Sequence, residues 1–114
     1  MNLKIERYES ILQREISYIL AREVKDKAIK FVTVNEVRLV PDLSIAKVYY
    51  TILDKEIISE TAKALKNATG FIRKKLAGRV EMRHIPELEF VYDESVEYGF
   101  KIESILKEIK NKDN

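Results

Sequence analysis

The spacing of the apolar residues along this 114-residue chain constrains its fold more than any other feature. Near the N-terminus these residues recur every three or four positions, which places them on one face of a helix. The pattern stops at Lys25-Asp26-Lys27, and no Pro or Gly precedes that point. The sequence therefore predicts one long amphipathic helix, whose buried face comprises Ile5, Tyr8, Leu12, Ile16, Ile19 and Leu20.

Two segments with strand-like patterns follow. Residues 31–40 are rich in β-branched side chains and end at Pro41-Asp42, a pair that suits the middle of a tight turn. Their alternation slips by one position between Val34 and Val37, which predicts a β-bulge near Asn35-Glu36. Residues 44–53 alternate regularly, so the two segments are expected to form a hairpin. The apolar face of the second strand comprises Ala46, Val48, Tyr50 and Ile52, and the opposite face Lys47, Tyr49 and Thr51.

Residues 56–79 return to the helical spacing, and Asn67-Ala68-Thr69-Gly70 interrupts them. Glycine inside a helix costs about 1 kcal/mol relative to alanine, so the interruption predicts a kink or a join between two shorter helices. The apolar face of this segment is Leu65, Ala68, Ile72 and Leu76.

A third strand is predicted at residues 88–92, with Leu88, Phe90 and Tyr92 facing inward. Pro86 cannot donate a ladder hydrogen bond, which places the start of this strand at an edge or a bend. A last helix follows, capped by Asp93 or Ser95, and residues 111–114 are expected to fray. The apolar stripe of that helix is Gly99, Ile102, Leu106 and Ile109.

The predicted order is α-β-β-α-α-β-α, which favours an α+β fold with helices on one face of a three-stranded sheet. Residues 1–110 are expected to form one domain, because a chain of 13.4 kDa buries enough surface to fold without disulfides or metals. No apolar run approaches the roughly 18 residues that span a bilayer, and the N-terminus does not resemble a signal peptide. We therefore expect a cytoplasmic protein, and nothing in the sequence requires more than a monomer.

The composition leaves little for catalysis. The chain has no Cys and one His, which excludes thiol nucleophiles and a two-histidine metal site. Three Gly residues, at positions 70, 78 and 99, permit neither a phosphate-binding loop nor a dinucleotide fingerprint. His84 and the carboxylate pairs Glu87/Glu89 and Asp93/Glu94 are more simply interpreted as surface groups. We expect no enzyme activity, no metal and no cofactor.

The charges are distributed unevenly. Residues 1–79 hold 16 Lys and Arg against 10 Asp and Glu, whereas residues 80–114 hold five against nine. Such a split favours a basic surface for a polyanion, although chance clustering of solvated charges gives the same counts.

Two basic clusters are candidates for that surface. On the first helix, Lys4, Arg7, Arg14, Arg22 and Lys25 fall within about 40° of one line, with Tyr18 at its middle. Cations with an interleaved aromatic are typical of a helix that lies along RNA phosphates, although an ordinary solvated face has the same composition. The second cluster straddles Ala68-Thr69-Gly70, where a glycine lets a polyanion approach the main chain; a packing kink is the alternative. Its members are Lys63, Lys66, Arg73, Lys74, Lys75 and Arg79.

Several segments, in this order, resemble bacterial ribosome-binding factor A. They are Arg14-Glu15-Ile16, Val24-Lys25-Asp26, residues 32–37, residues 41–49, residues 65–73 (LKNATGFIR) and residues 83–95. The chain departs from the family at Asp26-Lys27-Ala28, where members often carry Asp-Pro-Arg. The resemblance implies a type II KH-like domain in which an Ala-x-Gly kink, matched by Ala68, Thr69 and Gly70, replaces the GXXG loop of RNA-binding KH domains.

The resemblance also implies a function. Members bind the free small ribosomal subunit and its precursors, assist processing of the 16S rRNA 5′ end, and in several cases support growth in the cold. We expect this chain to bind 16S rRNA without catalysis. The alternatives are a generic single-strand RNA-binding module, a protein adaptor that uses Lys47, Tyr49 and Thr51, and a small nuclease. The residues assigned to RNA binding are Arg7, Arg14, Tyr18, Arg22, Lys25, Lys66, Arg73, Lys74, Lys75 and Arg79.

Overall fold

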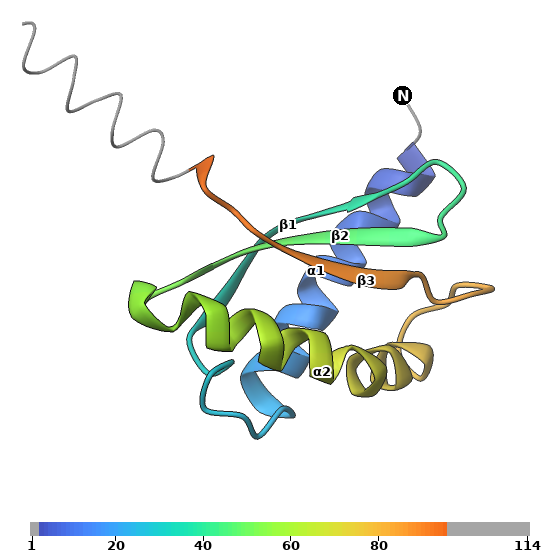
Figure 1. Ribbon diagram of the computed structural model, residues 1–114. Coiled ribbons are helices and arrows are strands. Elements are labelled where there is room, and N and C mark those ends of the chain that lie inside the picture. The colour runs from blue at the N-terminus through green and yellow to red at the C-terminus, as the bar shows by residue number, and fades with distance from the viewer. Residues whose placement is uncertain (1–2, 96–114) are drawn as a thin grey trace, which may run out of the picture.

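The described chain forms two layers, with helices α1 and α2 on one side of a three-stranded sheet (Figure 1). The computed structural model describes residues 3–95. The predicted α+β class is confirmed over these residues. The predicted last helix and the tail at 111–114 lie outside them. The elements are α1 (Leu3–Arg22), β1 (Val32–Leu39), β2 (Ile45–Ile52), the 3₁₀ helix η1 (Lys55–Ile57), α2 (Ile58–Ala77) and β3 (Glu87–Tyr92).

Strands β1 and β2 form the predicted antiparallel hairpin. The amide of Leu43 donates to the Val40 carbonyl oxygen at 2.8 Å, which places Pro41 and Asp42 at the middle of the turn. Asp42 Oδ1 accepts a hydrogen bond from the amide of Ser44 at 3.0 Å. Leu43 lies in the left-handed region, at φ 64°. The turn therefore uses the local bonding that its Pro-Asp pair predicted.

The predicted β-bulge is also present. The register of β1 against β2 shifts between Val34 and Glu36, which leaves Asn35 as the extra residue. The Asn35 side-chain amide donates to Asp93 Oδ2 at 3.1 Å, and its backbone carbonyl accepts from Gln13 Nε2 at 3.1 Å. The bulge thus connects the hairpin to α1 and to the residue that follows β3.

Polar side chains of α1 cover the outer border of β1. Gln13 Nε2 donates to the carbonyl oxygens of Val34 and Asn35, at 3.4 and 3.1 Å. The Glu9 carboxylate accepts from the amide of Leu39 at 2.8 Å. An edge strand leaves such backbone groups unpaired unless another element supplies partners. Helix α1 therefore holds the sheet by hydrogen bonds as well as by apolar packing.

Strand β3 runs parallel to β2, and the strand order is β1-β2-β3. Helix α2 makes the crossover connection that parallel strands require. The amide of Glu87 donates to the Ser44 carbonyl at 2.9 Å, and the amide of Asp93 donates to the Tyr50 carbonyl at 2.7 Å. Pro86 directly precedes β3, which is an edge strand of the sheet, so the predicted edge position of the strand start is confirmed.

One apolar core fills the space between the helices and the inner face of the sheet. Tyr50 lies at its centre and makes edge-to-face contacts with Phe90 and Tyr92, at ring-centroid distances of 6.2 and 5.8 Å. The core residues come from the faces that the apolar spacing predicted. They include Leu12, Ile16, Ile19, Leu20, Ala46, Val48, Tyr50, Leu65, Ile72 and Leu76.

Helix α2 corrects one detail of the prediction. It continues without interruption through residues 67–70, so this segment is one helix and not two. Figure 1 shows its axis changing direction part-way along, which agrees with the predicted kink. The Thr69 hydroxyl donates to the Lys66 carbonyl at 2.9 Å, a contact that often bends helices. Burial of Leu65, Ile72 and Leu76 on both sides of Gly70 outweighs the weak helix preference of glycine.

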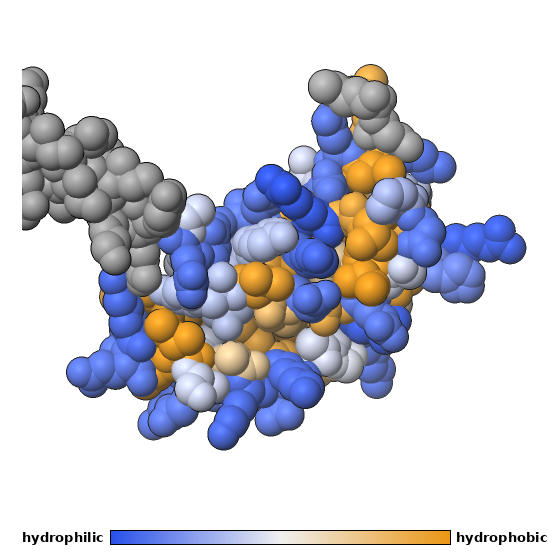
Figure 2. Space-filling view, turned by 45° about the horizontal axis from the view of Figure 1, so that its top comes forward, coloured by the Kyte–Doolittle hydropathy of each residue, from blue (hydrophilic) through white to orange (hydrophobic). Residues whose placement is uncertain are grey.

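The side of the molecule drawn in Figure 2 is mostly polar, with apolar patches set among charged side chains. On the outer face of the sheet, Lys47, Tyr49 and Thr51 are half-buried. The guanidinium of Arg38 lies 6.0 Å from the Tyr49 ring centroid and pairs with Glu36 at 2.7 Å. Neither helix of residues 3–95 is both long and apolar enough to cross a membrane.

Candidate nucleic-acid interface

The basic residues of α1 are exposed along one side of the helix. Arg7, Arg14, Tyr18 and Arg22 all present exposed side chains, and their spacing places them on one line. Arg14 contacts Glu15 at 3.7 Å, a pair that solvent weakens because the Arg14 side chain is 74% exposed. The helix ends at Arg22, so Lys25 lies in the following loop and not on the helical line. The C-terminal end of the helix is closed by two hydrogen bonds, in which the amides of residues 23 and 24 donate to the Ile19 carbonyl oxygen.

Arg79 joins the two basic clusters. Its guanidinium carbon lies 5.3 Å from the ring centroid of Tyr18, which is 51% exposed at the middle of the α1 line. The same guanidinium donates a hydrogen bond to Glu23. The clusters were predicted separately along the sequence, and the structure brings them together at the end of α2.

The Arg79–Glu23 pair sets the electrostatics of this junction. The hydrogen bond from Arg79 to Glu23 raises the pKa of Arg79 and fixes one side of its guanidinium. The second carboxylate oxygen of Glu23 is buried without a hydrogen-bond partner. One side of the Arg79 guanidinium is therefore hydrogen-bonded within the protein, and the Tyr18 ring lies within cation–π distance of the same group.

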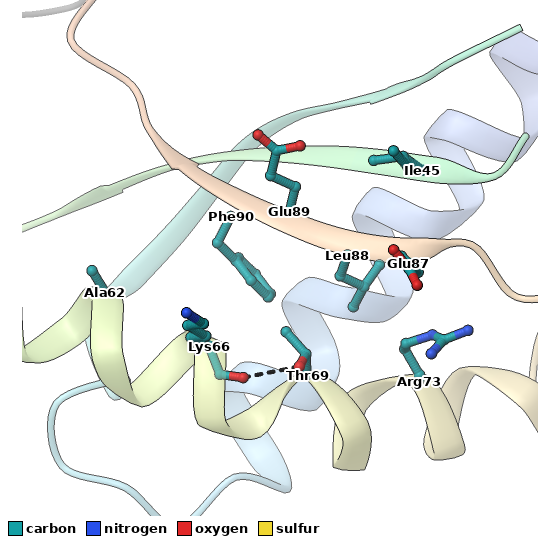
Figure 3. A pocket seen from close by; sticks show the side chains of 9 residues that line it. All are labelled: Ile45, Ala62, Lys66, Thr69, Arg73, Glu87, Leu88, Glu89 and Phe90. Atoms are coloured by element: carbon teal, nitrogen blue, oxygen red, sulfur yellow. Dashed lines mark hydrogen bonds between the residues drawn. The ribbon is translucent and has the colours of Figure 1, made fainter.

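The basic residues of α2 lie on two opposite flanks of the helix. Lys74 and Lys75 share one flank with Phe71, and with Gly78 and Arg79 they line a hollow at the end of α2. Lys66 and Arg73 lie on the other flank and face β3 across a groove (Figure 3). The predicted cluster is thus divided: Arg79 contacts Tyr18 of the α1 line, Lys74 and Lys75 line the same hollow as Arg79, and Lys66 and Arg73 face β3.

Arg73 has a structural role that the sequence did not reveal. Its Nε donates to the Pro86 carbonyl at 3.1 Å, and one terminal nitrogen donates to the Ile85 carbonyl at 2.9 Å. Its side chain is half-buried. These bonds hold the segment before β3 against α2 and leave fewer donors for a phosphate.

The groove between α2 and β3 has mixed charge. Leu88 and Phe90 point from β3 toward α2, and Glu89 points away (Figure 3). Besides Lys66 and Arg73, the lining includes Glu87 and Glu89. The Glu87 carboxylate at the rim opposes a polyanion, so this groove is a poorer phosphate site than the junction of α1 and α2.

The three residues of the kink motif, Ala68, Thr69 and Gly70, lie in different surroundings. Ala68 packs against the core, Thr69 lines the groove, and Gly70 is exposed. A Cβ built on Gly70 would have no heavy atom within 4 Å apart from its chain neighbours and the backbone of its own helix, and the residue does not have a positive φ. The position is therefore open to an approaching backbone, but no local contact requires glycine there.

Sequence reasoning missed Phe71 and Glu23. Phe71 is 42% exposed, and Lys75 Nζ lies 5.5 Å from its ring centroid. The i, i+4 spacing of an aromatic and a lysine on a helix was a signal for this pair. Glu23 gave no such signal, because its partner Arg79 is 56 residues away in the chain.

Nothing in residues 3–95 is arranged for metal binding, since no three His, Cys, Asp or Glu side chains come together there. His84 is exposed on the segment before β3. Burial raises the pKa of Tyr50, and hydrogen bonds from Ser95, and then from Asn35, lower the pKa of Asp93. These shifts belong to the core and to a chain turn, and they do not form an acid–base pair.

The sequence profile of ribosome-binding factor A matches residues 4–106. The chain belongs to the ribosome-binding factor A family. Ribosome-binding factor A of Staphylococcus epidermidis is 47% identical over 114 residues, which cover 98% of this chain and 97% of that protein. The range matched by the profile includes α2, all of α1 except Leu3, and every residue of the candidate interface.

Solved structures of ribosome-binding factor A share the fold. The crystal structure of the Thermus thermophilus protein superposes with a TM-score of 0.71 at 31% identity, covering 77% of this chain and 93% of that one. A homology model of the Thermus thermophilus factor, fitted into a cryo-electron-microscopy map of its complex with the 30S subunit, has a TM-score of 0.63 at 30% identity. That match covers 75% of this chain and 91% of that one.

Proposed function

We propose that this protein binds the free small ribosomal subunit and its precursors through 16S rRNA, and that it assists late assembly and processing of the 16S rRNA 5′ end. The observation that carries the proposal is the contact of Arg79 with Tyr18, which joins the cations of α1 and α2 into one surface. Family membership and the 30S complex of the Thermus thermophilus relative support the same partner.

The proposed surface contacts rRNA mainly through phosphates. Its members are Arg7, Arg14, Tyr18, Arg22, Lys25, Lys74, Lys75 and Arg79. Arginine forks match phosphate geometry, and release of condensed counterions supplies the affinity. Tyr18 offers a ring for stacking on an unpaired base or a sugar. Lys66 and Arg73 stay at the margin of the proposed contact, because they face β3.

The protein acts by binding and not by cutting RNA. A factor that binds one rRNA conformation better than another shifts the equilibrium between them by its differential affinity. In this proposal, the favoured conformation exposes the 16S rRNA 5′ end to a separate processing enzyme. The work is done in the cytoplasm by a monomer, and its benefit is largest in the cold, where misfolded RNA helices persist longer.

Co-sedimentation with small-subunit precursors tests the proposal. We expect Lys74→Glu to weaken binding, because it places a negative charge within the surface. Lys47→Glu makes the same charge change on the outer face of the sheet and is the matched control. Footprinting of the precursor rRNA, with and without the protein, then locates the contact.

Three results would argue against the proposal. Equal loss of binding in both variants would indicate a general charge effect. Binding of Lys74→Glu equal to that of the unmodified protein would show that this part of α2 does not contact the subunit. Tight binding to any short single-stranded oligonucleotide, with no preference for the subunit, would favour a generic RNA-binding module.

A further inference from the structure

A hollow at the C-terminal end of α2 differs from the other depressions of the described surface. It has a volume of about 430 Å³ and is lined by Phe71, Lys74, Lys75, Gly78 and Arg79. A hollow of this size falls within the usual range for small-ligand sites. Phe71 forms its apolar wall and remains 42% exposed.

The ionisable side chains that line this hollow carry charge of one sign, and Glu23, the hydrogen-bond partner of Arg79, lies outside the lining. The three ionisable lining residues of the hollow are all cationic. The groove between α2 and β3 includes Glu87 and Glu89, and the depression beside the start of α1 includes Glu81. A further one, beside His84, again includes Glu87. Of these four, only the hollow at the end of α2 has no carboxylate in its lining, so it is the one that suits an anion.

The aromatic ring adds a second requirement on the ligand. An exposed phenylalanine between lysines is a poor partner for a bare phosphate, because its ring offers no hydrogen bond. It is a good partner for a flat, apolar face, and base–aromatic stacking is a recurrent mode of single-strand RNA recognition. A ligand that uses the whole hollow therefore carries a planar ring and a negative charge within a few ångströms of each other. An unpaired nucleotide has both.

Gly78 gives the ligand room. It caps α2, with its amide donating to the Lys75 carbonyl at 3.2 Å. A Cβ built there would have only the Lys75 carbonyl oxygen nearby, at 3.7 Å. The missing side chain thus leaves the floor of the hollow open between Phe71 and Arg79.

We propose that this hollow binds one unpaired RNA nucleotide, whose base stacks on Phe71 and whose phosphate contacts Lys74 and Arg79. The inference rests on the proposed function and deepens it, since it assigns one specific contact within the RNA-binding surface. Paired nucleotides of an A-form helix keep their base faces stacked on each other. The site therefore selects a loop, a bulge or a strand end, and it positions the protein at a single-stranded element of the rRNA.

Tryptophan fluorescence tests the stacking directly, because the chain contains no Trp. Phe71→Trp introduces a single reporter at the hollow. The probes are a single-stranded RNA decamer of mixed sequence and an abasic decamer with the same number of phosphates, both at low salt. We expect the RNA decamer to quench the fluorescence and the abasic decamer to leave it unchanged.

Phe31→Trp is the matched control. Phe31 is exposed, and Lys30 Nζ lies 5.6 Å from its ring centroid, so its local surroundings resemble those of Phe71. It lies in the loop before β1, outside the four depressions compared above. We expect neither decamer to quench this reporter. Equal quenching at both positions, or quenching of Phe71→Trp by the abasic decamer, would overturn the proposal.

Subunit binding gives an independent measurement. Phe71→Leu keeps an apolar side chain and removes the aromatic ring, and we expect it to weaken binding to small-subunit precursors by roughly 5- to 150-fold. Binding equal to that of the unmodified protein would overturn the nucleotide site. The proposed function would survive that result if Lys74→Glu still weakened binding. Quenching of Phe71→Trp by precursor particles but not by the RNA decamer would assign the hollow to a ribosomal protein instead.

Discussion

Arg73 and Arg79 show how one residue type serves two purposes within six positions. Arg73 holds the carbonyls of Ile85 and Pro86, and Arg79 faces Tyr18 and Glu23. The sequence pattern placed both residues in the second basic cluster of a predicted helical segment. It could not predict their partners, because those partners come close only when the chain folds. This is why Arg73 was assigned to RNA binding together with its neighbours.

The structure separates the effects of Arg73 and Lys74 on stability. Arg73→Ala removes two hydrogen bonds that hold the segment before β3, and we expect a loss of about 1–3 kcal/mol in the free energy of unfolding. Lys74→Ala removes an exposed side chain and should change it by less than about 0.5 kcal/mol. Urea unfolding monitored by circular dichroism measures both. Equal stability of the two variants would show that the Arg73 side chain is free to bind RNA.

Asp93 makes stability depend on pH in the acid range. Hydrogen bonds from Ser95 and Asn35 lower the pKa of Asp93 in the folded chain, so its charged form stabilises the fold above the unfolded-state pKa, near the usual 3.8. That contribution is lost as the pH falls through the folded-state pKa. We therefore expect Asp93→Asn to destabilise the protein at pH 7, and the difference in stability to shrink progressively as the pH falls from about 4 toward 2. A difference that stays constant between these pH values would contradict this assignment.

Single elements were predicted well where the information is local. The tight turn, the bulge at Asn35 and the inner faces of the strands all depend on a few neighbouring residues, and all are confirmed. Two features of the helices were left open by the sequence or differ from it in detail. Helix α1 ends at Arg22, before the change in sequence pattern, and α2 continues through Gly70. In α2, burial of Leu65, Ile72 and Leu76 on both sides of Gly70 outweighs the local preference.

Gly70 offers a test of what bends α2. No neighbouring atom blocks a Cβ at this position, and its backbone does not have a positive φ. Gly70→Ala should therefore raise the free energy of unfolding by up to about 1 kcal/mol, the usual difference in helix preference. Thermal unfolding measures the change. A loss of stability would show that the bend needs the backbone freedom of glycine, and Ala77→Gly, with the opposite expected sign, serves as the control.

At the scale of the whole molecule, the sequence predicted the layers but not which surfaces meet. The order β1-β2-β3 and the parallel direction of β3 depend on the crossover by α2. That crossover also places the end of α2 beside Tyr18, more than 50 residues away in the chain. Charge counts indicated a basic surface, and helical angles found most of its residues. The aromatic Phe71 was missed, because an apolar residue within a helix is usually part of the core.

Salt dependence follows from the whole basic surface. Seven cations that neutralise six or more phosphates should make affinity for the small subunit fall by roughly 10³–10⁵ between 50 and 200 mM salt. Binding measured by co-sedimentation across this range gives the slope. Lys74→Glu should make the slope shallower, and Lys47→Glu should leave it unchanged. A flat dependence would favour a protein–protein contact such as the adaptor alternative.

The polar contacts from α1 to β1 determine how this sheet can grow. Gln13 and Glu9 occupy backbone groups at the outer side of β1, so a foreign strand finds few free donors or acceptors there. Extension of the sheet by another chain is thereby directed to β3 at the opposite border. Because α1 and β1 precede β3 in the chain, we expect these contacts to be able to form before β3 is made, which would cover that side of β1 against pairing with another chain.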